Sequence, residues 1–87
     1  MEDEQILTLY WQRDSRAIEA SREKYGPYCL AVARGILADG RDCEECVSDT
    51  WLHAWQAIPP HRPAVLRMFL AKITRRLSFN RWKANTA

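Results

Sequence analysis

The sequence predicts an all-α fold, a small bundle of about four helices, and three observations lead to this prediction. Apolar residues recur at helical spacing over most of the chain, whereas the alternating pattern of a strand is almost absent. The three glycines and four prolines are clustered and divide the chain into short segments. With 87 residues, of which 47% are hydrophobic and 28% charged, the chain has the size and composition of one globular domain.

We expect the four helices at residues 3–13, 15–37, 41–58 and 64–84, with a loop at residues 59–63. The apolar face of the first helix consists of Ile6, Leu7, Tyr10 and Trp11. Asp14 or Ser15 is expected to cap the second helix. Apolar spacing continues on both sides of Gly26-Pro27, so we interpret this pair as a kink within one helix.

The third helix follows a turn at residues 38–40, and Asp39 with Asp42 resembles an acidic capping box at its start. Its expected core face consists of Cys43, Cys46, Val47, Thr50, Trp51, Ala54 and Ile58. The prolines between residues 59 and 63 cannot continue the helix, so a stiff, basic loop follows. The core stripe of the last helix consists of Leu66, Phe69, Leu70, Ile73 and Leu77.

Charge is divided unevenly along the chain, although the net charge is only +2. Residues 1–50 contain all eleven acidic side chains and six basic ones, which gives −5. Residues 51–87 contain seven basic side chains and no acidic one, which gives +7. A small domain with this division is expected to bind two chemically different partners, one of them a polyanion.

Several classes of protein do not fit the sequence. The acidic N-terminus lacks the apolar run of a signal peptide, and no segment is apolar enough to span a membrane. Three cysteines, an odd number, argue against a disulfide framework and suit a reducing cytoplasm. Cys43 and Cys46 form a CxxC within a helix, with His53 seven residues further on, but we interpret them as core residues. No catalytic residue, metal site or cofactor is therefore expected, and the chain is not expected to be an enzyme.

A second face of the third helix mixes acidic and apolar side chains. Glu45, Ser48, Leu52 and Trp55 follow helical spacing in one stripe, and Asp49 lies beside it. Such a stripe is typical of a surface on which another helix docks. In the alternative interpretation, Trp55 folds back onto the core and Leu52 is an ordinary exposed leucine, because single apolar residues are common on protein surfaces.

The last helix has a second face on which cations alternate with aromatic rings. It consists of Met68, Lys72, Arg75, Phe79 and Trp82, with Arg76 and Lys83 beside them. Basic side chains follow phosphates and aromatic rings stack on unpaired bases, at about 1–3 kcal/mol for each base. Single-stranded or opening DNA suits this face better than the duplex major groove. The alternative is a solvated basic helix whose Phe79 and Trp82 pack on the first helix.

Two segments carry a resemblance to a known family. They are residues 42–55, with the sequence DCEECVSDTWLHAW, and residues 69–82, with the sequence FLAKITRRLSFNRW. Together they resemble region 2 of bacterial sigma factors of the extracytoplasmic-function (ECF) type, over nearly the whole chain. The resemblance implies that the first segment docks on the clamp-helix coiled coil of the RNA polymerase β′ subunit. It also implies that the last helix and its preceding loop bind, melt and hold the non-template strand of the minus-ten promoter element.

The resemblance assigns these two roles to particular residues. The polymerase contact is assigned to Glu45, Ser48, Asp49, Leu52 and Trp55. The DNA contact is assigned to the loop with His61 and Arg62, which would capture a flipped base, and to Lys72, Arg75, Arg76, Phe79, Trp82 and Lys83. Ser48 stands where the family often has Gln, Arg76 where it often has Asn, and Asn80 where it often has Asp. The last two differences make the last helix more basic than usual.

From the sequence we therefore expect a cytoplasmic transcription initiation factor domain that binds RNA polymerase core through β′ and single-stranded promoter DNA. An anti-sigma factor is a further expected partner. The family carries a second helical domain that reads the minus-thirty-five element, whereas this sequence stops at Ala87, so we expect either an excised domain of a longer protein or a natural fragment. The alternative function is a protein-interaction module that binds polymerase or an anti-sigma factor without DNA. A helix-turn-helix repressor fits less well, because no short Gly-containing turn precedes a helix with base-reading side chains.

Overall fold

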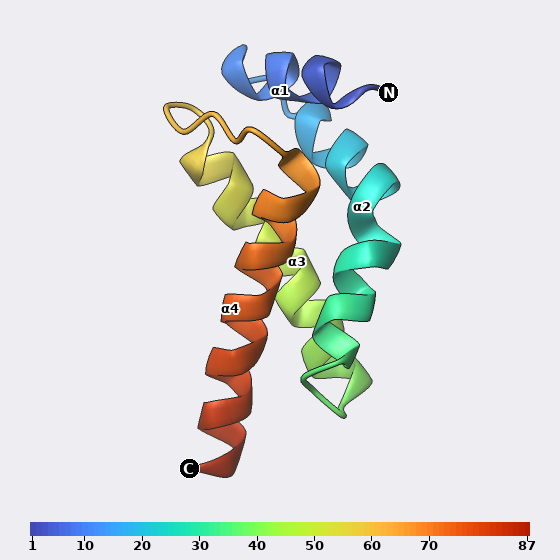
Figure 1. The fold of residues 1–87 in the computed structure, drawn as a ribbon, viewed down its shortest axis with the longest axis vertical. Helices are drawn as coiled ribbons and strands as arrows, with labels where there is room; N and C mark the ends of the chain where they lie inside the picture. The colour runs from blue at the N-terminus through green and yellow to red at the C-terminus, as the bar shows by residue number, and fades with distance from the viewer.

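The computed structural model describes residues 1–87 and contains four helices and no strand, which confirms the predicted all-α bundle. The helices are α1 (Asp3–Trp11), α2 (Arg16–Arg34), α3 (Gly40–Ala57) and α4 (Leu66–Thr86). Figure 1 shows α2 and α4 running in the same direction, with α3 antiparallel to both. The short α1 lies across one end of the bundle, and the loop between α3 and α4 lies at that same end (Figure 1). None of the four helices has the length and apolar character needed to cross a membrane.

The first helix ends at Trp11, two residues earlier than the sequence suggested, because the chain turns into a left-handed conformation at Arg13. Arg13 has a φ of 55°. Its backbone N–H donates to the carbonyl of Tyr10 at 3.0 Å, and the N–H of Asp14 donates to the carbonyl of Leu9 at 2.9 Å. These two bonds form a Schellman motif, which satisfies carbonyls that the helix end leaves without partners.

Aspartates begin both α2 and α3. Asp14 accepts a hydrogen bond from the N–H of Arg16 at 3.0 Å, whereas Ser15 makes no side-chain cap. Asp39 accepts from the N–H groups of the residues at 41 and 42, at 2.7 and 3.2 Å. The expected acidic capping box at α3 is only half formed, because the side chain of Asp42 reaches instead to α4.

The long helices differ from the expected boundaries at two further places. α2 runs through Pro27 as one helix and ends at Arg34 rather than residue 37. The loop after α3 spans residues 58–65 rather than 59–63, because Val65 is extended and α4 begins only at Leu66. α4 then continues to Thr86, two residues further than expected.

All four helices contribute to one core cluster. Its buried members are Ile6, Leu7, Tyr10, Ala17, Tyr25, Cys29, Trp51, Ala54, Ile58, Leu66, Leu70 and Ile73. A smaller cluster at the far end of α2 and α3 consists of Ala33, Leu37, Cys43 and Cys46. The core faces expected for α3 and α4 are buried except for Val47, Phe69 and Leu77, which are half-buried. Trp11, expected on the apolar face of α1, is instead 43% exposed.

Buried hydroxyl pairs join the helices across the core. The Tyr10 hydroxyl of α1 lies 2.6 Å from the Ser21 Oγ of α2. The Thr50 Oγ1 of α3 lies 2.8 Å from the Thr74 Oγ1 of α4. All four side chains are buried, so each pair satisfies polar groups that would otherwise be costly to remove from water.

Candidate nucleic-acid interface and docking surface

A pocket of about 550 Å³ lies between the 58–65 loop and α4. Its lining residues are His61, Phe69, Lys72, Ile73, Arg75, Arg76 and Phe79. Five of the eight residues predicted to contact DNA thus line one pocket, which combines three cations with three aromatic rings and contains no carboxylate. The arrangement suits a ligand that presents flat rings and negative charge together.

An aromatic contact fastens the loop to α4 at this pocket. The imidazole of His61 stacks on the ring of Phe69 with centroids 4.9 Å apart and planes 29° apart. Phe69 was expected in the core, but it is only half-buried because part of its ring faces His61. Sequence reasoning therefore missed Phe69 as a site residue; its place at the edge of the core stripe, beside the basic face, was the signal.

The cations of the pocket are exposed and make few contacts within the protein. Lys72 and Arg75 form no ion pair, and Arg76 reaches only the Nδ1 of His53 at 3.4 Å. Arg62, in the loop, faces away toward α1, where it lies 3.5 Å from a carboxylate oxygen of Glu4. The charge of α4 at the pocket is thus not neutralised inside the domain.

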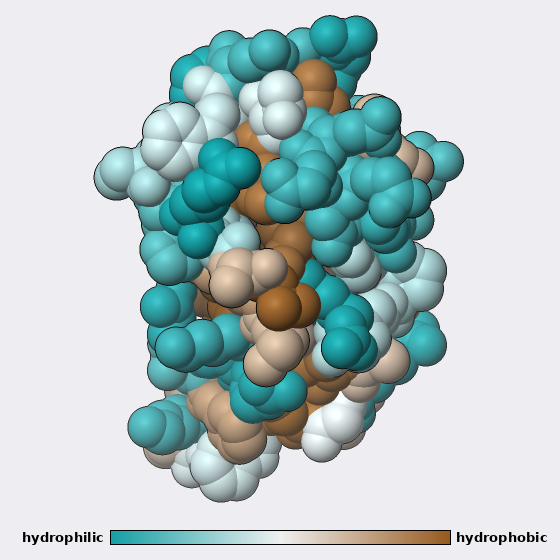
Figure 2. Space-filling model, turned by 45° about the horizontal axis from the view of Figure 1, so that its top comes forward, coloured by the Kyte–Doolittle hydropathy of each residue, from teal (hydrophilic) through white to brown (hydrophobic).

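Two aromatic side chains further along α4 are also exposed. Phe79 is 46% and Trp82 47% exposed, and together with Gly35 and Ile36 at the end of α2 they line a hollow of about 190 Å³. The alternative in which both rings pack on the first helix is therefore wrong. Lys83 is exposed beside them. Figure 2 shows an apolar seam that runs down one face of the molecule with hydrophilic side chains on both sides.

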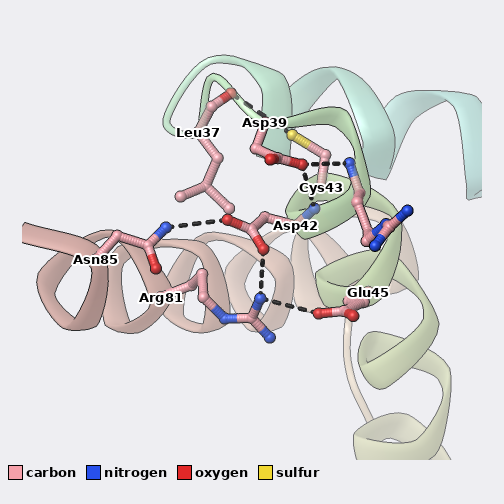
Figure 3. A network of polar contacts seen from close by, with 8 residues as sticks. Leu37, Asp39, Asp42, Cys43, Glu45, Arg81 and Asn85 are labelled. Carbon is pink, nitrogen blue, oxygen red and sulfur yellow. Dashed lines mark hydrogen bonds and ion pairs between the residues drawn. The ribbon is translucent and has the colours of Figure 1, made fainter.

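One cation of α4 is held inside the domain instead (Figure 3). The Arg81 guanidinium donates from Nη1 to Asp42 at 2.6 Å and to Glu45 at 2.9 Å. Asn85 donates to the second oxygen of Asp42 at 2.9 Å. The bond to Glu45 and the charge of both carboxylates raise the pKa of Arg81. This network ties the end of α4 to the start of α3 and occupies Glu45, which was predicted to contact polymerase.

The rest of the predicted docking stripe divides into an exposed part and a packed part. Ser48 and Asp49 are exposed, and Leu52 is 52% exposed. Trp55 is half-buried and packs against the core, with the Arg13 guanidinium 3.6 Å from its ring centroid. Trp55 thus folds back as in the alternative interpretation, and the exposed surface of the stripe centres on Leu52.

A groove between α2 and α3 borders this surface. It has a volume of about 270 Å³ and is lined by Arg22, Gly26, Leu30, Glu44, Val47, Ser48 and Trp51. Its apolar floor and charged rim suit the side chains of an approaching helix. The sequence could not predict this groove, because three of its seven lining residues come from α2, whose register against α3 is fixed only by the fold.

The cysteines lie apart from both surfaces. Cys29, Cys43 and Cys46 are free thiols and buried, and burial raises the pKa of each thiol. The Cys43 Sγ donates to the carbonyl of Leu37 at 3.5 Å. No group of three or more His, Cys, Asp or Glu side chains is placed to hold a metal ion.

The domain thus combines a cationic, aromatic pocket on α4, a feature that is expected of nucleic-acid-binding proteins, with an acidic and apolar surface on α3. Residues 22–87 match the family model described as sigma-70 region 2, so the chain belongs to that family. The family is a non-catalytic part of transcription initiation factors and takes part in RNA polymerase binding and promoter melting. No curated protein and no solved structure matches the chain.

Proposed function

We propose that this domain is the polymerase-binding and minus-ten-recognising region 2 of a sigma factor of the ECF type, acting in the cytoplasm. The observation that carries the proposal is the pocket between the loop and α4, which lies inside the span matched to the family. It combines cations and aromatic rings on the residues for which the sequence predicted DNA contact.

Strand opening follows from the chemistry of this surface. Lys72, Arg75 and Arg76 would bind phosphates of the non-template strand, while His61 and Phe79 would stack on bases that have left the duplex. Each stacked base contributes about 1–3 kcal/mol, which offsets the few kcal/mol lost when a base pair opens. Trp82 and Lys83 would extend the same contact toward the end of α4.

The polymerase partner would dock on the exposed part of α3. Leu52 is the apolar anchor, Ser48 and Asp49 are its polar rim, and the groove beside Ser48 would receive a side chain of the β′ clamp coiled coil. Glu45 would contribute charge while it remains bonded to Arg81. Trp55 would support this surface from beneath. An anti-sigma factor would compete for the same surface.

We propose that residues 1–87 form one domain, although α1 and the start of α2 precede the matched span. The contacts of α1 with the other helices support a single domain. Ile6, Leu7 and Tyr10 belong to the main core cluster together with residues of α3 and α4.

The DNA contact is tested with a labelled single strand of about 12 nucleotides and mixed sequence, by fluorescence anisotropy over a range of salt concentrations. Wild-type protein should bind the strand more tightly than the same strand in a duplex. The Lys72→Ala/Arg75→Ala variant should bind less tightly, and its salt dependence should fall by roughly 1.4 in log–log slope. Arg16→Ala/Arg22→Ala removes the same charge from α2 and should behave as wild type. Equal binding by both double variants would contradict the DNA assignment.

The docking surface is tested by binding to the isolated β′ coiled coil. Leu52→Ala should weaken this binding, whereas Met68→Ala, which shortens a similarly exposed apolar side chain on α4, should not. Unchanged affinity in a folded Leu52→Ala variant would refute the assignment. Coiled-coil binding without any binding of the single strand would favour the pure protein-interaction module instead.

A further inference from the structure

We infer that Arg13, which precedes the span matched to the family, is a positioning residue for the nucleic-acid pocket. Its guanidinium braces the end of α3 and thereby fixes the 58–65 loop against α4. The inference rests on the proposed function of the pocket, but the contacts that it invokes exist without any ligand.

The backbone conformation of Arg13 indicates that its side chain makes contacts that stabilise the fold. With a φ of 55°, Arg13 occupies the left-handed position after α1, where glycine is the favoured residue because it has no Cβ. An arginine there is less favourable for the backbone than a glycine. Unlike glycine, however, an arginine at this position can make side-chain contacts that offset this backbone cost.

These contacts converge on the last turn of α3. The Arg13 Nη1 donates to the carbonyls of Trp55 and Ile58, both at 2.8 Å, and its guanidinium lies 3.6 Å from the centroid of the Trp55 ring. Carbonyls at a helix end lack partners within the helix, and a cation there interacts favourably with the helix dipole. α3 has no basic residue in its own last turn, so Arg13 supplies this cation from the turn between α1 and α2.

The last turn of α3, which Arg13 contacts, leads directly into the loop that lines the pocket. The backbone N–H of His61 donates to the carbonyl of Ala57 at 2.9 Å, within the turn that Arg13 holds. The ring of the same His61 stacks on Phe69 and lines the pocket. Figure 1 shows α1, the end of α3 and the loop gathered at one end of the bundle. A chain of direct contacts therefore leads from Arg13 to His61.

The brace is tested first in the protein without DNA, by NMR of the imidazole protons. The chain has only two histidines, so His53→Gln assigns the signals of His61. Stacking on Phe69 displaces these signals through the ring current. Arg13→Gly keeps the left-handed turn but removes the guanidinium, and it should bring the His61 signals toward those of an unstacked histidine while the domain remains folded. Arg13→Lys, which keeps the charge but lacks the planar group, should give a large part of the same change.

Arg16→Ala is the matched control, because it removes a cation three residues away that contacts only Asp14. It should leave the His61 signals at their wild-type positions. Unchanged His61 signals in Arg13→Gly would overturn the inference.

Binding of the labelled single strand separates positioning from direct contact. Arg13→Gly should weaken binding about 2- to 10-fold, because a His61 that is held less firmly stacks less well on a base, and it should leave the salt slope unchanged. A slope lower by about 0.7 would mean that Arg13 contacts a phosphate itself, which would overturn the positioning role. If the wild-type protein does not bind the strand, the proposed function fails, while the NMR experiment still decides whether Arg13 holds the loop.

Discussion

The hydrogen bond between Tyr10 and Ser21 gives a sharp test of whether α1 is an integral part of the domain. The two oxygens lie 2.6 Å apart, and both side chains are fully buried. This bond joins α1 to the first turns of α2, in a part of the chain that precedes the family match. The perturbation is Tyr10→Phe, which removes the hydroxyl and keeps the ring in the core.

The expected loss of stability follows from the state of the remaining hydroxyl. A typical hydrogen bond contributes about 0.5–1.5 kcal/mol, and a buried polar group left unpaired costs about 1–3 kcal/mol. The Ser21 hydroxyl can turn to the carbonyl of Ala17 one helical turn earlier, which recovers part of the loss. We therefore expect Tyr10→Phe to lower the free energy of unfolding by about 1–2 kcal/mol, which corresponds to a melting temperature lower by about 4–16 °C for a domain of this size.

The assay is a double-mutant cycle followed by urea unfolding, with Tyr10→Phe, Ser21→Ala and the double variant. Replacing both partners leaves no buried hydroxyl unpaired, so the double variant should lose less stability than the two single variants together, by at least about 0.5 kcal/mol. Additive losses would show that the two hydroxyls do not interact. A loss near zero in both single variants would show that α1 is not docked as the structure has it.

Three further predictions concern the thiols, alkaline stability and the docking surface. The three buried cysteines should react with a thiol reagent only when the domain opens or unfolds, so the labelling rate should rise as urea is added. Rapid labelling of the native protein without urea would contradict their burial. Burial raises the pKa of these thiols and of Tyr10 in the folded state, so above about pH 9 the unfolded chain releases protons first and the free energy of unfolding should fall as pH rises. A flat profile between pH 7 and 10 in urea unfolding would refute this. In thermal unfolding, Trp55→Ala should destabilise the domain by about 2–3 kcal/mol and Leu52→Ala by less than about 0.5 kcal/mol. Equal losses would contradict the assignment of Trp55 to the packed part and Leu52 to the exposed part of the docking stripe.

Helical periodicity predicted the architecture and most of the core faces of α3 and α4, because a face depends only on residues of the same helix. The basic and aromatic face of α4 and the exposed position of Leu52 were therefore accessible from the sequence. The packing of Trp55 against the core could not be predicted from the sequence. Whether this side chain turns to solvent or to the core depends on Tyr10 and Arg13, which lie far away in the sequence and meet it only in the folded chain.

The helix boundaries failed for a related reason. Trp11, Gln12 and Arg13 are all compatible with a helix, so local propensity did not end α1. The helix ends because Arg13 turns left-handed, a conformation that the contacts of its side chain with α3 support. Glycine at this position would have been a recognisable stop signal in the sequence, and arginine was not.

In the fold, the acidic and basic parts of the sequence meet at only one point of α4. α4 contains no carboxylate, so any neutralising group must come from another part of the chain. Only Arg81 receives such groups, from Asp42 and Glu45, at the end of α4 that lies against the start of α3. Lys72 and Arg75 line the pocket and form no ion pair. The acidic part of the chain thus anchors α4 at one point, and the positive charge that remains is concentrated beside exposed aromatic rings.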